Sequence, residues 1–266
     1  MHEQQNIRIR LFGTLDALRS DGTVVEQCEW KTGKTRDLLR LLALADGHPV
    51  RVAALIAKLW PDASPSRARN SLGTAASQIR GTFRESCVTR QADALVLQGA
   101  WVDVNAFKSL VGQARFSARA SAPTDVLTNA RAALSLYRGD FHAHDDESAW
   151  ARGERHLLRR LRVETLCDAS VAANDVGLPR EALDLASTAV ALDPAVEAAH
   201  RSVMRAHAQL GEVGMALRAY EACRSHLAHE LGADPSPQTQ ELHLRILRGP
   251  GDLQASGALS RLRDPG

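Results

Sequence analysis

The sequence is poor in cysteine and contains no long apolar run. Its four cysteines include no CxxC pair, which argues against a disulfide framework and against a structural zinc site. No stretch approaches the ~18 consecutive apolar residues of a membrane span, and residues 1–6 are polar rather than a signal peptide. We therefore expect a cytoplasmic protein that neither crosses nor binds a membrane.

Lysine is scarce, and most of the positive charge lies in one part of the chain. The sequence has 29 Arg against 4 Lys and a formal net charge of +2. Between Lys31 and Arg90, 11 basic residues accompany only 4 acidic ones, a net of +7. Such a stretch suits a DNA phosphate backbone. An arginine-rich coding bias, which scatters cations everywhere, is the competing explanation, and charge alone does not separate the two.

The length of 266 residues fits two domains at ~100–200 residues each, and a hydrophobic fraction of 44% is ordinary for globular proteins. The first part begins with strand signals. Residues 7–12 alternate between apolar and polar, and 14–18 and 23–25 flank the turn pair Asp21-Gly22. These patterns predict a small antiparallel sheet, followed by helices over 34–45 and 51–60.

A third helix carries the strongest functional signal in this part. Ser64 is a suitable N-cap with Pro65 at the first helical position, and the helix is expected to end near Arg84. Its apolar residues recur every three or four positions, so its polar residues share the opposite face. Arg, Asn and Gln on such a face can contact base edges in a major groove. A solvated helix face is the alternative.

Two short strand signals follow the third helix. Residues 87–90 and 95–97 form a predicted hairpin where a winged helix has its wing. This favours DNA binding over a merely solvated helix. The expected DNA-binding residues are Arg67, Arg69, Asn70, Thr74, Ser77, Gln78, Arg80, Arg84 and Arg90. Among them, Asn70, Thr74 and Gln78 are the candidates for base contacts, and most of the arginines for phosphate contacts.

The rest of the chain is predicted to be helical. The expected helices span 103–119, 125–137, 147–174, 180–192, 196–210, 213–229 and 237–247. Ala182-Leu183 and Ala216-Leu217 lie 34 residues apart, which is the tetratricopeptide period. We therefore predict an α+β winged helix-turn-helix domain over 1–100, an all-α tetratricopeptide-like domain over 101–248 and a flexible tail over 249–266.

No motif indicates catalysis. Thr32-Gly33-Lys34-Thr35 resembles part of a phosphate-binding loop, but Cys28 stands where that loop needs its first glycine. No nucleophile–base constellation or paired-carboxylate motif stands out either. We expect a protein that is not an enzyme and that requires no cofactor or metal.

Several short sequence segments resemble those of the Streptomyces antibiotic regulatory proteins, a family of transcriptional activators. In the first part they are residues 9–13, Trp30, 59–62, 68–72 and 77–80; in the second part they are 102–107, 136–140, 150–152, 192–194 and 230–237. The resemblance implies an OmpR-like winged helix joined to a bacterial transcriptional activation domain. It also implies a homodimer that binds direct repeats near a promoter and recruits RNA polymerase holoenzyme to an antibiotic gene cluster.

The sequence departs from that family pattern on the third helix. Gly73, Ala75, Ala76 and Gln78 replace residues that are usually bulkier, polar or basic, which bears on the operator sequence. An alternative is therefore an interaction protein whose tetratricopeptide groove binds a protein or effector, with a weakened DNA-binding domain. In the turn before the third helix, Asp62 and Ser64 are the candidates for polymerase contact.

Overall fold

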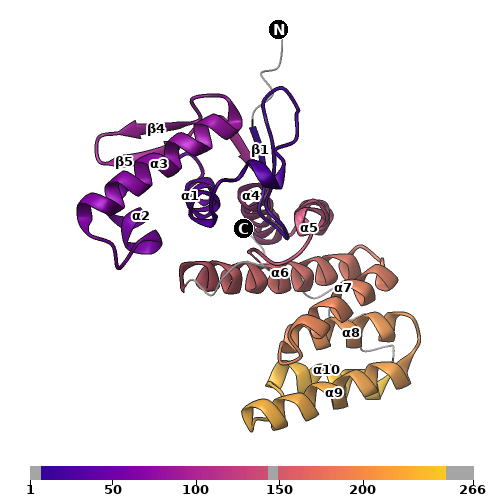
Figure 1. Cartoon of the computed structure of the whole chain (residues 1–266). Coiled ribbons are helices and arrows are strands. Elements are labelled where there is room, and N and C mark those ends of the chain that lie inside the picture. Colours follow the sequence, from indigo (N-terminus) through magenta and orange to yellow (C-terminus); the bar gives the residue numbers. More distant parts are fainter. Residues whose placement is uncertain (1–6, 143–148, 250–266) are drawn as a thin grey trace, which may run out of the picture. The chain divides into compact units, whose positions relative to one another are not determined.

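The computed structural model describes residues 7–142 and 149–249, and these form two compact units (Figure 1). The first unit consists of residues 1–109 with 135–158, and the second of 110–134 with 159–266, taken where they are described. The first unit thus draws on residues beyond 100, the position of the predicted domain boundary. The predicted tail lies outside the described residues except for Gly249.

The first unit begins with a mixed sheet, so the prediction of a purely antiparallel sheet is wrong. Strand β1 (Ile7–Arg10) pairs antiparallel with β2 (Asp16–Leu18) and parallel with β6 (Ala100–Val102). The predicted strand 23–25 forms a single bridge, between Val24 and Leu18. A three-residue strand such as β6 is too short to show a period of two, and its partner lies some 90 residues away in sequence, so local pattern missed it.

The helix-turn-helix and wing predictions are confirmed. A 3-10 turn, η1 (Gln27–Glu29), precedes α1 (Gly33–Leu44), which begins at the N-cap Thr32. Then follow β3 (Val50–Arg51), α2 (Val52–Leu59) and α3 (Pro65–Phe83). The wing consists of β4 (Val88–Gln91) and β5 (Ala94–Leu97), and β3 completes a sheet in the order β3-β5-β4.

Large side chains fill the core of the first unit. Phe12 and Phe107 meet edge to face with their ring centroids 5.4 Å apart, and Tyr137 packs against both rings. The buried carboxylate of Asp103 accepts the N–H groups of Leu11 at 2.7 Å, Phe12 at 3.2 Å and Val104 at 2.8 Å. Burial raises the pKa of Asp103, although these three donors favour the charged form. The start of α4 is thereby tied to the end of β1.

The helices beyond residue 102 are confirmed, with small shifts at their ends. They are α4 (Asp103–Arg119), α5 (Pro123–Leu136), α6 (Ala149–Asp175), α7 (Pro179–Leu192), α8 (Glu197–Gln209), α9 (Val213–Leu231) and α10 (Pro237–Arg248). In the second unit α7 packs on α8, and α8 packs on both α9 and α10. This nearest-neighbour stacking is tetratricopeptide-like.

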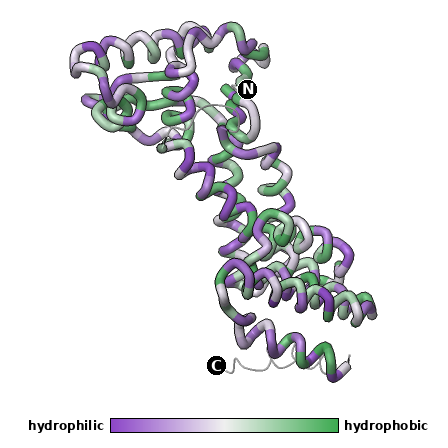
Figure 2. The backbone as a smooth tube through the Cα atoms, turned by 60° about the horizontal axis from the view of Figure 1, so that its bottom comes forward, coloured by the Kyte–Doolittle hydropathy of each residue, from purple (hydrophilic) through white to green (hydrophobic). Residues whose placement is uncertain are grey.

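Small residues allow these helices to approach one another closely. One core cluster of the second unit contains Ala130, Ala169, Ala172, Ala173, Ala182 and Ala206, with only Val126 and Leu127 larger. Apolar and polar residues alternate along each helix of the tube in Figure 2, as expected when one face of a helix packs and the other meets water. Among the described residues, no helix is long and apolar enough to cross a membrane.

Candidate nucleic-acid interface

Helix α3 separates its apolar and polar residues onto two faces. Its buried residues include Ala68, Leu72, Ala75, Ala76, Ile79 and Phe83. On the other side Arg67, Arg69, Asn70, Thr74 and Ser77 are exposed, whereas Gln78 and Arg80 are half-buried. Five of the nine predicted DNA-binding residues are thus solvent-exposed on one helix.

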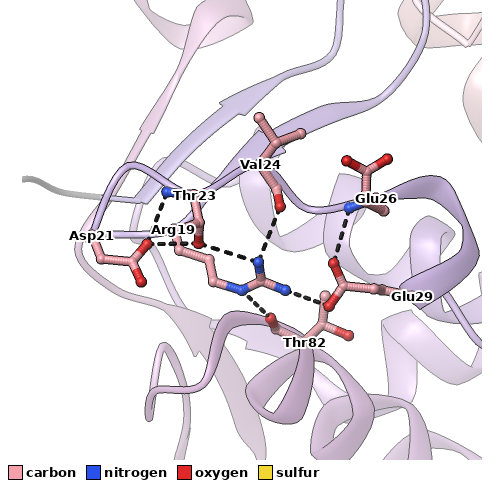
Figure 3. Close-up of polar contacts among 7 residues, drawn as sticks. All are labelled: Arg19, Asp21, Thr23, Val24, Glu26, Glu29 and Thr82. Carbon is pink, nitrogen blue, oxygen red and sulfur yellow. Dashed lines mark hydrogen bonds and ion pairs between the residues drawn. The ribbon is translucent and has the colours of Figure 1, made fainter.

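Arg19 anchors the C-terminal end of α3. Its guanidinium is buried, and its Nε donates to the Thr82 carbonyl oxygen at 2.8 Å (Figure 3). The remaining nitrogens donate to the Val24 carbonyl oxygen at 3.0 Å and form an ion pair with Glu29. The N–H of Glu26 and the charge on Arg19 lower the pKa of Glu29. Charge-assisted bonds at a buried site hold geometry well, so the angle of α3 is fixed from this end.

A shallow groove runs between the start of α1 and the polar side of α3. Its volume is about 520 Å³. From α3 it is lined by Ser66, Arg67, Asn70, Ser71, Thr74, Ala75 and Gln78, and from elsewhere by Thr32, Lys34, Thr35 and Trp60. The predicted DNA-binding residues do not include these last four: Lys34 was counted in the basic stretch 31–90, and Thr32 and Thr35 were considered only as part of a nucleotide loop. The packing of α1 against α3 brings Thr32, Lys34 and Thr35 to the predicted DNA face, and Trp60 reaches it from the end of α2, which also packs on α3.

One hydrogen bond across this groove orients Gln78. The Thr35 hydroxyl donates to Gln78 Oε1 at 2.5 Å, and the Thr32 hydroxyl accepts the Thr35 N–H at 3.1 Å. The side-chain oxygen of Gln78 is therefore engaged within the protein. Its Nε2 remains the group that can address a ligand in the groove.

The arginines near the wing differ in how they are held. Arg80 donates to the Val88 carbonyl oxygen at 3.1 Å, so it joins α3 to β4. Arg84 is exposed and has a left-handed conformation at the C-cap of α3. Arg90 is 68% exposed, donates to the Ala92 carbonyl oxygen at 3.2 Å and lies 4.0 Å from Asp93. Arg80 thus has a structural contact in addition to its predicted role.

The turn before α3 projects its side chains into solvent. Asp62 and Ser64 are both exposed. Ser64 occupies the N-cap position, as predicted, but its side chain makes no capping hydrogen bond. Its hydroxyl is thus not needed to satisfy the first turn of α3.

The fold is that of a winged helix-turn-helix regulator with a tetratricopeptide-like second part. The family model for the bacterial transcriptional activator domain matches residues 102–247. Transcriptional regulator RedD of Streptomyces coelicolor is 28% identical over 96% of this chain and 74% of its own length. Regulatory protein AfsR of the same species is 28% identical over 94% of this chain, which spans only 25% of AfsR.

Among solved structures, Mycobacterium tuberculosis EmbR in complex with a low-affinity phosphopeptide superposes with a TM-score of 0.82. The two sequences are 24% identical, and the match covers 96% of this chain and 69% of the EmbR chain. This likeness establishes the fold. The chain belongs to the bacterial transcriptional activator domain family and, within it, to the Streptomyces antibiotic regulatory proteins. It is a transcriptional regulator.

Proposed function

We propose that this protein activates transcription of a secondary-metabolite gene cluster by binding a direct-repeat operator as a homodimer and recruiting RNA polymerase. The observation that carries the DNA-binding step is the groove along α3. Cationic and amide side chains from two helices converge there, on a surface that a duplex can reach. Membership of the bacterial transcriptional activator domain family supports the activator role. The target class is what likeness to the Streptomyces antibiotic regulatory proteins implies.

The contacts divide into two kinds. Arg67 and Lys34 are exposed cations that line the groove, and Arg69 is exposed elsewhere on α3. All three would meet phosphates, which carry affinity but little sequence information. Asn70 and Thr74 are exposed and polar, so they are candidates to read base edges. Gln78 would read a base acceptor such as guanine O6 or N7, since its own oxygen is engaged by Thr35.

Titration of a labelled operator duplex at several salt concentrations tests the DNA-binding step. Arg67→Ala is expected to weaken binding to all sequences and to make the salt slope shallower by about one. Asn70→Ala is expected instead to relax discrimination at one base pair, a loss of ~1–3 kcal/mol against the preferred base. Arg224→Ala, an exposed arginine on α9, is the control. Wild-type affinity in both groove variants would move the interface elsewhere.

Operator geometry tests the direct-repeat dimer. Two protomers bound in the same orientation on one DNA face need half-sites about one helical turn apart, ~10–11 base pairs. Inserting about five base pairs turns one half-site to the opposite face. Cooperative binding should then disappear, and restoring a full turn should bring it back. Cooperativity that survives the half-turn insertion would rule out this arrangement.

The turn before α3 is the proposed polymerase contact. Asp62 and Ser64 are exposed, and the flanking Pro61 and Pro65 limit the ordering cost of docking. The double substitution Asp62→Ala and Ser64→Ala should lower transcription in a purified system without changing operator affinity. Equal losses in both measurements would assign this turn to DNA binding.

A further inference from the structure

Three arginines gather on two packed helices of the second unit, well away in sequence from α3. Arg201 and Arg205 are four residues apart, so they share a face of α8. Arg245 lies on α10, which packs on α8. Arg201 donates to the Thr239 hydroxyl of α10 at 2.9 Å, which joins the two helices beside the other two arginines. We refer to Arg201, Arg205 and Arg245 as the arginine cluster.

In the part of the chain that the structure describes, two members of the cluster lack a partner for their guanidinium groups. Arg201 bonds Thr239 and lies 3.8 Å from Glu197. Within residues 7–142 and 149–249, neither Arg205 nor Arg245 forms a hydrogen bond or an ion pair, although both are half-buried. The Nε atom of Arg245 is fully buried and finds no acceptor among the described residues. A guanidinium has five N–H donors, and a buried N–H that forms no hydrogen bond lowers the stability of the fold.

The cluster is also electrostatically unfavourable. Burial lowers the pKa of Arg205, and the like charges of Arg245 and Arg201 lower it further. Only the carboxylate of Asp175, at the end of α6, opposes this effect. Burial raises the pKa of Asp175 itself. The folded chain therefore holds cations together that repel one another, an arrangement that an anion would stabilise.

The surroundings indicate which kind of anion fits. Residues 159–248 contain 10 Arg and no Lys against 12 Asp and Glu, so this region as a whole repels a long polyanion such as DNA. A short segment with a few carboxylates can meet the cluster locally without that penalty. Carboxylates also match the planar fork of arginine through two parallel hydrogen bonds. Arg248, exposed one turn beyond Arg245, extends the row of cations.

We propose that the arginine cluster is a docking site for an acidic segment of a partner protein, whose carboxylates bind the guanidinium groups of Arg205 and Arg245. The site is separate from the proposed DNA interface, and its test does not depend on DNA binding. It gives the helical unit a binding role of its own.

Fluorescence anisotropy with the full chain tests the proposal. The probe is a labelled peptide of alternating Glu and Ala, and the reference is the same peptide with Gln in place of every Glu. At ~150 mM salt the wild type should bind the Glu peptide and not the Gln peptide. The double substitution Arg205→Gln and Arg245→Gln should weaken binding about tenfold or more. Arg218→Gln, an exposed arginine on α9, should change it less than about twofold.

Controls separate loss of the site from loss of the fold. The Gln double variant removes like-charge repulsion, so it should unfold at a temperature no lower than the wild type. If it does not fold, Arg205→Lys with Arg245→Lys keeps the charges, loses the paired hydrogen bonds and should show intermediate binding. Equal binding of both peptides, unchanged binding in the Gln or Lys variant, or displacement of the peptide by duplex DNA or inorganic phosphate at matched charge would each overturn the proposal.

Discussion

The two units of the protein have cores of different kinds. Four of the five phenylalanines, Phe12, Phe83, Phe107 and Phe141, are buried, and all four lie in the first unit. In the second unit, alanines dominate the central cluster of α5, α6, α7 and α8. The first core depends on rings that meet from distant parts of the chain. The second depends on small residues that let neighbouring helices touch.

This difference predicts how each unit responds to change. A core of large rings loses most when a ring is removed, because a cavity remains. A core of small residues is most sensitive to added volume, because the helices have no space between them. Four predictions follow from this contrast, in order of decreasing effect.

The largest effect is expected from cutting the chain after Gly99. The remaining fragment lacks β6, the parallel partner of β1, and it lacks Asp103, which binds the N–H groups of Leu11 and Phe12. We expect no cooperative unfolding transition by circular dichroism for this fragment, in contrast to the full chain, for which we expect cooperative unfolding. A sharp transition in the fragment would mean that residues 1–99 form a self-sufficient domain.

Removing one ring from the first core should cost several kcal/mol. Phe107 is fully buried against Phe12 and Tyr137, so Phe107→Ala should lower the free energy of unfolding by ~3–5 kcal/mol. Phe116→Ala on the same helix is the matched control, since Phe116 is 74% exposed, and its effect should stay within ~0.5 kcal/mol. Urea titration measures both. Similar losses in the two variants would contradict the ring-based core.

Adding volume to the core of the second unit should lower the free energy of unfolding by less than the loss of a ring does, but still by a measurable amount. Ala182 is fully buried in the alanine-rich cluster, so Ala182→Leu should lower the free energy of unfolding by ~1–3 kcal/mol. The same substitution at Ala222, which is exposed on α9, supplies the control and should have little effect. A neutral or stabilising effect of Ala182→Leu would show that unfilled space remains between these helices.

The smallest effect concerns the hydrogen bonds that Glu197 accepts in the second unit. Glu197 Oε2 accepts the Ser236 N–H at 2.9 Å and hydroxyls from Ser236 and Thr239. Burial tends to raise the pKa of Glu197, but these donors and Arg201 lower it overall. The carboxylate therefore stabilises the fold above its unfolded pKa of ~4.3, and this contribution is lost as pH falls through the lower folded value.

Glu197→Gln should accordingly cost ~1 kcal/mol at neutral pH, because hydrogen bonds to a charged acceptor are stronger than those to an amide. The difference from wild type should shrink as the pH drops below ~4. Unfolding titrations at pH 7 and at acid pH measure it. A difference that is constant with pH would show that charge at this position is unimportant.

Local sequence patterns were sufficient to predict the helices and to recognise the family. Pro65 and the apolar spacing of α3 defined that helix, and the 34-residue period of Ala182 and Ala216 indicated the stacked helices. Helical periodicity is a local property, so it is visible without knowledge of distant contacts. The exposed residues of α3, such as Arg67 and Asn70, follow from the same periodicity.

Only the tertiary structure decided what distant segments do for one another. No local signal relates Ala100–Val102 to β1, Arg19 to the end of α3, or Thr35 to Gln78, because these contacts join residues 43 or more positions apart. The arginine cluster is likewise a product of packing, since Arg205 and Arg245 are 40 residues apart and become neighbours only when α10 packs on α8. Sequence determined which faces are apolar, and the burial of those faces determined which polar groups meet.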